Sequence, residues 1–238
     1  MSSNSISGDI LKKRIKPSDI ALAAGIIGVF VSFFIAVGVM SGAVTQHYEK
    51  KIIVCLDAGH GASDNGAVSA DGKRLEKNDN LNLTLTVGEK LRQKGISVLY
   101  TRSGDTEITL KQRCKIANKY HCNLFVSVHR NSSATGTGIE AWISNAPKGN
   151  EKELAQKLVN DISTVTDTPN RGVKSGYRDS VNENYYINAN TNMPSLLLEV
   201  GFVTSREDNE AFDKKCDEIA ETVAEDLYNF LSENIENG

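Results

Sequence analysis

Short apolar runs alternate with longer helix-like segments from Lys51 onward, and this alternation constrains the fold more than any other feature of the chain. Short runs rich in β-branched and aliphatic residues are typical of buried strands. Strands that alternate with helices form a mostly parallel or mixed sheet with helices on both faces. The sequence therefore predicts an α/β fold. The predicted strands are Ile52–Leu56, Ile96–Thr101, Leu124–His129, Ile139–Ser144 and Leu196–Val200, and the predicted helices are Glu76–Lys94, Thr109–Tyr120, Glu151–Val165 and Cys216–Leu231.

One N-terminal segment, residues 20–44, contains no charged side chain. At ~1.5 Å per residue, a helix of this length spans the ~30 Å hydrocarbon core of a bilayer. The alternative is a cleaved signal peptide, whose apolar core is usually only about 7–15 residues long. The length favours an uncleaved transmembrane helix. The predicted organisation is a basic tail (1–19), a transmembrane anchor (20–44), a linker (45–50) and a main domain (51–234).

Basic residues are concentrated before this apolar segment. The cluster Lys12, Lys13, Arg14 and Lys16 precedes it, and only Lys50 and Lys51 follow closely. Because positive charge is retained on the cytoplasmic side, the tail is expected in the cytoplasm and the main domain outside the cell membrane.

The charge of the main domain argues against nucleic acid as a partner. Residues 1–51 carry a net charge of +3, while the whole chain carries −3, so the remainder carries −6. A nucleic-acid-binding domain is expected to be basic instead.

The four cysteines show no CxxC pair, which excludes zinc-knuckle and thioredoxin-like motifs. Cys55 and Cys114 are expected to be small buried hydrophobic residues. A disulfide between any two of Cys55, Cys114, Cys122 and Cys216 remains open.

Three predicted strands deliver polar side chains that suit acid–base or metal chemistry. His60 follows the first strand within a glycine-bearing loop, and His129 ends the strand 124–129. In open α/β sheets, sites form outside the carboxyl ends of strands, so both histidines can converge there. Glu199 stands among leucines, where a carboxylate is costly to bury unless it is paired or lies near a cation. Two further histidines, His47 and His121, are interpreted as surface residues.

Two imidazoles and one carboxylate, with the fourth position left to water, form a typical catalytic zinc site. His60, Glu76 and His129 fit the ligand roles, and Glu199 fits the role of a general base that passes a proton to a leaving amine. Glu76 has a plainer alternative role, because an acidic residue in the first turn of a helix also interacts favourably with the helix dipole.

Four stretches in this order resemble the zinc-dependent N-acetylmuramoyl-L-alanine amidases of bacterial cell walls. They are Asp57-Ala58-Gly59-His60-Gly61, Leu75-Glu76-Lys77, Ser127-Val128-His129-Arg130-Asn131 and Leu198-Glu199-Val200-Gly201-Phe202. The resemblance covers about residues 51–234 and includes Tyr100-Thr101-Arg102, Arg171-Gly172-Val173-Lys174 and Asn192-Met193-Pro194-Ser195.

The resemblance implies a twisted, mostly parallel sheet flanked by helices. It also implies Zn²⁺ held by His60, Glu76 and His129, with Glu199 as the catalytic glutamate. The substrate would be peptidoglycan, cleaved at the amide between N-acetylmuramic acid and L-alanine. Small amidases of this layout trim cortex peptidoglycan in spore formers, so a sporulation or germination setting is permitted. Whether an activating protein partner is needed stays open.

Two residues depart from the pattern of that family. Arg130 stands where a small residue usually follows the second histidine, and Ala62 replaces a glycine after the first. Arg130 is expected to narrow the groove or to bind a substrate carboxylate. The alternatives to the amidase are a zinc peptidase that cuts within the stem peptide, a catalytically silent peptidoglycan-binding protein and a structural anchor protein.

Overall fold

The computed structural model describes residues 51–178, 180 and 182–236. Six strands in this part of the chain form a single sheet in the order β2-β1-β3-β6-β4-β5. The strands are β1 (Ile53–Ala58), β2 (Ser97–Tyr100), β3 (Leu124–Asn131), β4 (Ile139–Ile143), β5 (Asn170–Ser175) and β6 (Ser195–Phe202). The helices are α2 (Glu76–Gln93), α3 (Leu110–Lys119), α4 (Glu151–Thr166), α5 (Tyr186–Asn190) and α6 (Arg206–Glu236).

The sheet is mixed, with mostly parallel pairings. β1 pairs in parallel with β2 and β3, β3 with β6, and β4 with β5, whereas β4 runs antiparallel to β6. Because β1, β3 and β6 are parallel neighbours, their carboxyl ends lie at the same edge. The predicted α/β class with a mostly parallel sheet is confirmed.

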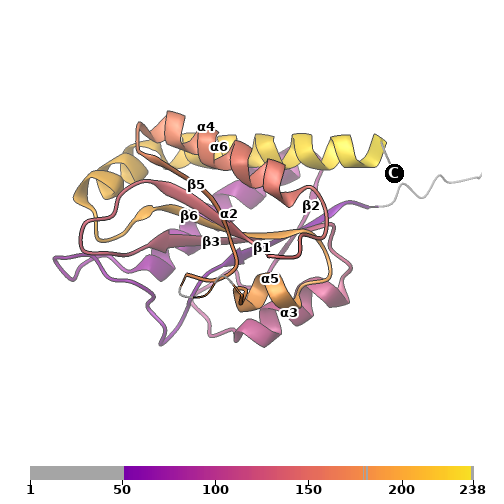
Figure 1. Ribbon diagram of the computed structural model, residues 1–238, viewed down its shortest axis with the longest axis horizontal. Helices are drawn as coiled ribbons and strands as arrows, with labels where there is room; N and C mark the ends of the chain where they lie inside the picture. The colour runs from indigo at the N-terminus through magenta and orange to yellow at the C-terminus, as the bar shows by residue number, and fades with distance from the viewer. Residues whose placement is uncertain (1–50, 179, 181, 237–238) are drawn as a thin grey trace, which may run out of the picture. The chain divides into compact units, whose positions relative to one another are not determined.

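Helices cover both faces of the sheet, as predicted. In Figure 1, α4 and α6 lie on one side of the sheet, and α3 and α5 lie on the other. The larger hydrophobic core lies under α2, α4 and α6, where residues such as Leu91, Leu158 and Leu227 pack against the sheet. A smaller core joins α3 and α5 to the other face through Cys55, Phe125 and Ile187 among others.

The prediction missed two elements, β5 and α5. β5 reads Asn170-Arg-Gly-Val-Lys-Ser and pairs only with β4 at the edge of the sheet. A strand at the edge of a sheet with one face exposed to solvent does not need a run of apolar residues, so its sequence does not show the pattern by which strands are predicted. α5 has five residues, too few for a helical period to show.

Helix α6 begins at Arg206, ten residues before the predicted start at Cys216. Its first turns are rich in charged residues, which masked the helical period. Asp208 connects this end of the helix to the sheet. Its Oδ2 accepts hydrogen bonds from the backbone N–H groups of Gly138 (2.9 Å) and Phe202 (2.7 Å).

The predicted tail (1–19), transmembrane anchor (20–44) and linker (45–50) lie outside the described residues, as does His47. Within the described part of the chain, no helix combines the length and the apolar character needed to cross a membrane.

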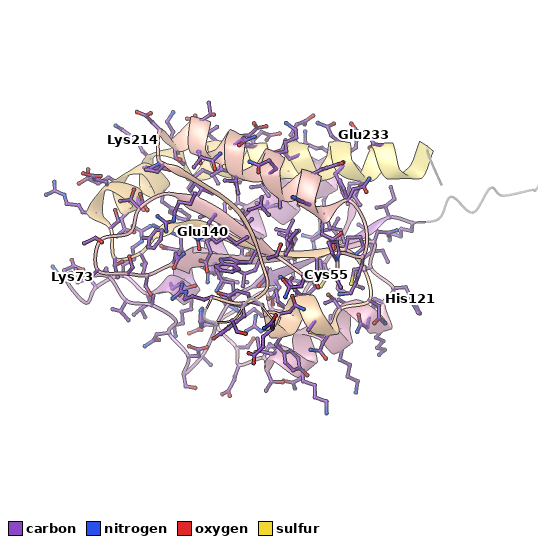
Figure 2. The ribbon with its side chains drawn as sticks, viewed as in Figure 1. Cys55, Lys73, His121, Glu140, Lys214 and Glu233 are labelled. Carbon is purple, nitrogen blue, oxygen red and sulfur yellow. The ribbon has the colours of Figure 1, made fainter. Side chains whose placement is uncertain are left out.

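All four cysteines are free thiols in this structure. Cys55, Cys114 and Cys122 are buried in the smaller core, which confirms the prediction for Cys55 and Cys114. Cys55 lies inside the molecule and His121 lies at its edge, exposed to solvent as expected (Figure 2).

Candidate functional site

The carboxyl ends of β1, β3 and β6 place the predicted site residues together. His129 on β3 is directly paired in register with Glu199 on β6. His60 follows the last residue of β1 by two positions, and Glu76 is the first residue of α2. The sheet topology therefore brings four residues that are far apart in the sequence to one edge.

The loop after β1 has an unusual backbone that turns His60 toward the other site residues. His60 has φ +62°, in the left-handed region that residues other than glycine seldom adopt. Two glycines make room beside it. A Cβ on Gly59 would lie 2.2 Å from Cε1 of His129, and a Cβ on Gly66 would lie 2.6 Å from Oε2 of Glu76. Neither position accepts a side chain without displacing a site residue.

Two buried arginines hold this loop through its carbonyl groups. Arg102 donates from Nε to the carbonyl of Ala58 and from Nη2 to that of Gly59, both at 2.9 Å. Arg113 donates to the carbonyls of Ala58 and His60 and forms an ion pair with Asp57 at 2.6 Å. The sequence analysis missed Arg113, because nothing in its helix indicates that it reaches the loop after β1.

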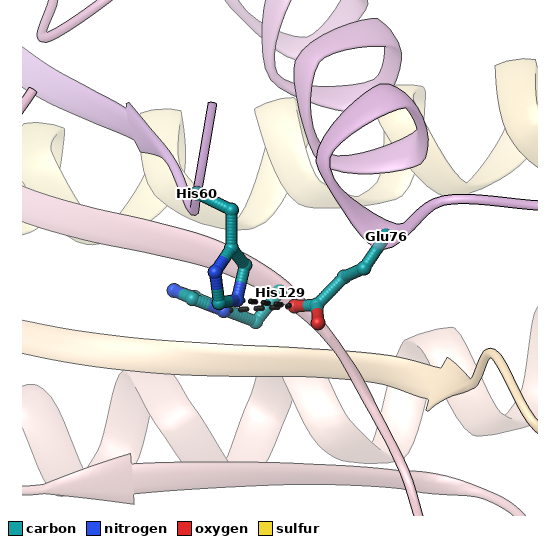
Figure 3. A group of neighbouring side chains, drawn as sticks. All are labelled: His60, Glu76 and His129. Atoms are coloured by element: carbon teal, nitrogen blue, oxygen red, sulfur yellow. Dashed lines mark hydrogen bonds and ion pairs between the residues drawn. The ribbon is translucent and has the colours of Figure 1, made fainter. Parts of the chain in front are cut away.

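His60, Glu76 and His129 form a cluster with the atoms of a metal site. One ligand-type atom from each lies within 4.8 Å of the others. Nε2 of His60 lies 3.2 Å from Oε1 of Glu76, and Nδ1 of His129 lies 2.9 Å from the same oxygen. Figure 3 shows both rings directed at that carboxylate. Two nitrogens and one carboxylate oxygen match the donor set of catalytic zinc, so the residues fit this metal.

Without a metal ion, the charges of the cluster favour a protonated His60 next to an ionised Glu76. Burial alone would lower the pKa of His60, but hydrogen bonds and charge from Glu76 and Asp64 outweigh burial and raise the pKa to about 9. Burial alone would raise the pKa of Glu76, but its bonds to His129 and His60 hold the pKa far below its usual range. A cation is therefore electrostatically favoured at this point.

The Glu76 carboxylate is fixed by three further donors. Oε1 accepts from the backbone N–H of Arg130 (3.1 Å) and from Nδ2 of Asn80 (3.2 Å), and Oε2 accepts from the backbone N–H of Ala67 (2.7 Å). These three hydrogen bonds fix the orientation of the Glu76 carboxylate, which a favourable interaction with the helix dipole does not need. The helix-dipole interpretation alone does not account for them.

Asp64 orients His60 from the opposite side. Its Oδ2 lies 2.8 Å from Nδ1 of His60, which leaves Nε2 directed at Glu76. A carboxylate on the second nitrogen is the usual partner of a metal-binding histidine. The sequence analysis missed Asp64, although an aspartate four residues after His60 in a glycine-bearing loop was an available signal.

Glu199 is buried and incompletely hydrogen-bonded. Its side chain lines the same cavity as the cluster, and Oε2 has no hydrogen-bond partner in the described protein. Burial raises the pKa of Glu199 to about 7, with His129 acting against that rise and Glu76 adding to it. A carboxyl group with a pKa near neutrality and a free oxygen suits proton transfer.

Arg130 does not lie where the sequence analysis expected it. Its side chain is 2% exposed and points away from Glu199 toward α2 and α6. It donates to Oδ2 of Asp79 (2.6 Å) and to Oδ1 of Asn209 (2.8 Å) and lies over the ring of Phe212. Because these partners occupy the guanidinium, Arg130 is not placed to bind a substrate carboxylate, and that expectation is wrong.

Ala62 adopts φ +50°, where glycine would be unstrained. Its carbonyl accepts from Nζ of Lys77 (2.7 Å), and its N–H donates to Oδ1 of Asp105 (2.7 Å). Lys77 and Asp105 also pair at 2.9 Å. This ion pair holds the strained backbone in place of the missing glycine.

The cavity at the site has a volume of about 640 Å³. Glu76, His129 and Glu199 lie in it. One wall comes from residues 107–110 at the start of α3, and the other comes from residues 177–178 and 185–187 around α5. Sequence analysis did not predict the second wall, because it missed α5.

A family comparison matches most of the described chain. Residues 54–230 match the model of a family described as N-acetylmuramoyl-L-alanine amidase.

Three curated relatives from Bacillus subtilis (strain 168) share between 27% and 34% of their aligned residues with the chain. The uncharacterized protein YqiI is 34% identical over 65% of this chain and 72% of its own length. The amidase LytC is 31% identical over 65% of this chain but only 30% of LytC. A germination-specific N-acetylmuramoyl-L-alanine amidase is 27% identical over 76% of this chain and 80% of that protein.

Solved structures of similar proteins show the same fold. The catalytic domain of the amidase CwlV from Bacillus (Paenibacillus) polymyxa var. colistinus is 34% identical, with a TM-score of 0.68 over 76% of this chain and 98% of that one. An N-acetylmuramoyl-L-alanine amidase from Clostridium difficile 630 is 33% identical, with a TM-score of 0.70 over 77% and 98%. The CwlD amidase from Clostridioides difficile, solved with the GerS lipoprotein, is 28% identical, with a TM-score of 0.65 over 79% and 100%.

Proposed function

This chain belongs to the N-acetylmuramoyl-L-alanine amidase family and is an enzyme of that class. We propose that it is a zinc hydrolase in which His60, Glu76 and His129 bind the zinc ion. The observation that carries the proposal is the cluster of ligand atoms within 4.8 Å of one another, beside a buried glutamate with a free oxygen. Zinc in such a site supplies Lewis-acid chemistry, which polarises a carbonyl and makes water a better nucleophile.

The substrate bond is the amide between the lactyl group of N-acetylmuramic acid and L-alanine of peptidoglycan. Glu199 accepts a proton from the attacking water, whose oxygen adds to the lactyl carbonyl carbon. Glu199 then returns the proton to the nitrogen of L-alanine as the carbon–nitrogen bond breaks. The products are a free lactyl carboxylate and the free amine of the peptide. In the metal-free protein, burial raises the pKa of Glu199 to about 7, and a cation bound by the neighbouring ligands would act against that rise.

Product analysis tests this proposal. The full chain, purified in detergent and supplied with zinc, should release intact stem peptides that begin with L-alanine from defined muropeptides. Removal of zinc by a chelator should abolish release, and added zinc should restore it. Shortened peptides still attached to muramic acid would indicate a stem-peptide peptidase instead. A zinc-loaded protein that binds muropeptides without product would be a silent binding protein.

We also propose that residues 20–44 anchor the enzyme in the cell membrane with the catalytic domain (51–234) outside the cytoplasm. The absence of charge from residues 20–44 and the basic cluster before them support this topology. The relative named as a germination-specific amidase supports a role in spore peptidoglycan. The solved pair of CwlD and GerS supports a search for a protein partner.

A further inference from the structure

Arg178 is a cation in the wall of the catalytic cavity. It lines the same cavity as His129 and Glu199, and its charge is among those that act on the pKa of Glu199. Tyr177, the preceding residue, forms a backbone bridge with Ser180 and an edge-to-face ring contact with Tyr185 at 4.8 Å. The aromatic contact ties Arg178's turn to the start of α5.

One hydrogen bond positions the Arg178 side chain. Its Nη2 donates to Oδ1 of Asn131, at 2.6 Å, and Asn131 is buried at the end of β3. Nδ2 of Asn131 donates in turn to Oε1 of Glu140, at 2.9 Å. Because the Glu140 carboxylate binds the amide nitrogen of Asn131, the amide oxygen of Asn131 faces Arg178.

The nearby carboxylate of Glu140 is already paired with other cations. Its Oε2 lies 2.7 Å from Nε of Arg171 and 2.6 Å from Nζ of Lys174, and its Oε1 also accepts from the indole of Trp142. Arg178 itself forms no ion pair with a carboxylate of the described residues. A guanidinium has five N–H donors, and a single bond to a neutral amide leaves most of them available to the cavity.

The other arginines that line the cavity are each already paired with a carboxylate of the protein. Arg113 pairs with Asp57 and two carbonyls, and Arg130 pairs with Asp79 and Asn209. Among the lining residues that the structure describes, Arg178 is thus the arginine left to meet an anion from outside. The sequence analysis offered this role for Arg130 as one of two possibilities, but the strand turns the Arg130 side chain toward α2 and α6.

We propose that Arg178 is a specificity residue that binds a carboxylate on the peptide side of the scissile amide. This inference rests on the proposed function. In that substrate the lactyl carboxyl group is consumed in the amide, so a nearby carboxylate belongs to the peptide. Because Arg178 shares the cavity with Glu199, the carboxylate belongs to the residue directly after L-alanine. A guanidinium and a carboxylate form strong, directional charge-assisted bonds.

The test compares two muropeptides that differ only in whether the residue after L-alanine carries a free carboxylate or a carboxamide. The zinc-loaded full chain should cleave the carboxylate substrate with a kcat/KM roughly 10- to 100-fold higher, mainly through a lower KM. Arg178→Gln should bring this ratio close to one by raising the KM of the carboxylate substrate alone. Arg178→Lys should keep part of the preference.

Arg206→Gln is the matched control, because Arg206 is an exposed cation on α6 outside this cavity. It should retain the wild-type ratio. Arg178 is itself exposed, so its variants should fold, and a thermal melt would check this.

Three results would overturn the inference. The wild-type enzyme could cleave both substrates equally, or Arg178→Gln could keep the wild-type preference. An equal loss of kcat on both substrates would instead assign Arg178 to the reaction itself. None of these three results contradicts the amidase activity. If the wild-type enzyme cleaved the muramoyl amide of neither substrate, both the proposed function and this inference would be wrong.

Discussion

At the scale of single residues, two glutamates of the same cavity have opposite electrostatic surroundings. Glu76 faces two imidazoles and three N–H donors, all of which favour its charged form. Glu199 is buried between His129 on β3 and Glu140 on β4 and keeps an oxygen without a partner, and its burial favours the neutral form. Environments that separate the pKa values of two carboxyl groups separate their chemical roles.

Replacement of each glutamate by glutamine should distinguish a metal ligand from a proton carrier. Glu199→Gln keeps the shape but removes the titratable group, so turnover should fall roughly 10²- to 10⁴-fold while zinc content stays near wild type. Glu76→Gln should weaken zinc binding as well as activity. The measurements are metal content after dialysis against a chelator and muropeptide hydrolysis. Loss of zinc in Glu199→Gln together with retention in Glu76→Gln would reverse the two assignments.

The stability of the metal-free protein should fall as the pH rises from about 6.5 to 9. The His60 pKa of about 9 in the folded state exceeds the ordinary value of about 6.5. A raised folded-state pKa contributes stability that is complete below the unfolded pKa and is lost as the pH passes through the folded one. Urea unfolding of chelator-treated protein at several pH values measures this.

His60→Asn is the control for this pH dependence, because it removes the titrating group. Its unfolding free energy should change less over the same pH window than that of the wild type. A wild-type protein whose stability rises between pH 6.5 and 9 would show that His60 is not held protonated by Glu76 and Asp64.

At the scale of elements, Arg130 joins β3 to the first turns of α2 and α6. Its guanidinium bonds Asp79 on α2 and Asn209 on α6, while its backbone N–H bonds Glu76. Arg74 completes the group, with Nε 2.6 Å from Asp79. The residue that departs from the family's small side chain therefore belongs to the packing around the site rather than to the substrate groove.

Arg130→Met should destabilise the fold by about 3 kcal/mol, because removal of one partner leaves a buried charge less well compensated. Asp79 retains Arg74, which places the expected loss at the low end of the range for broken buried pairs. Unfolding in urea gives the measurement. Arg206→Met, which breaks the exposed pair with Glu210, should cause only a small loss of unfolding free energy, because water screens an exposed ion pair. A loss of the same small size in Arg130→Met would show that the buried group contributes little.

At the scale of the whole molecule, the described domain holds all four site residues that the sequence predicts. The described residues supply the zinc-type cluster, the buried glutamate and both cavity walls. Our proposal is that the N-terminal segment places this domain at its substrate. We expect the segment to determine on which side of the membrane the catalytic domain lies.

Protease added to intact protoplasts should digest the catalytic domain, because the basic cluster before residue 20 should hold the N-terminus in the cytoplasm. A cytoplasmic protein detected in the same samples is the control for intact cells. Full protection of the domain would reverse the topology and separate the enzyme from its cell-wall substrate. A mature chain that begins near residue 45 would show that the apolar segment is cleaved.

The sequence by itself determined the α/β class and the edge of the sheet where the site forms. An apolar run that precedes His60, one that ends in His129 and one that includes Glu199 are local patterns. Parallel strands bring their carboxyl ends together whatever the details of packing. These three residues could therefore be found from local patterns, whereas Glu76 was singled out by the resemblance to the amidase family.

Only the tertiary structure decided which face each neighbouring side chain meets and which distant residues complete the cavity. Successive strand residues point to opposite faces, so His129 and Arg130 separate, but the face covered by α2 and α6 depends on the packing of the helices. Edge strand β5 and short helix α5 carry too little pattern to be predicted. Arg178 reaches the site through Asn131, which lies 47 positions away in the chain, and such a contact is fixed by the fold and not by local sequence.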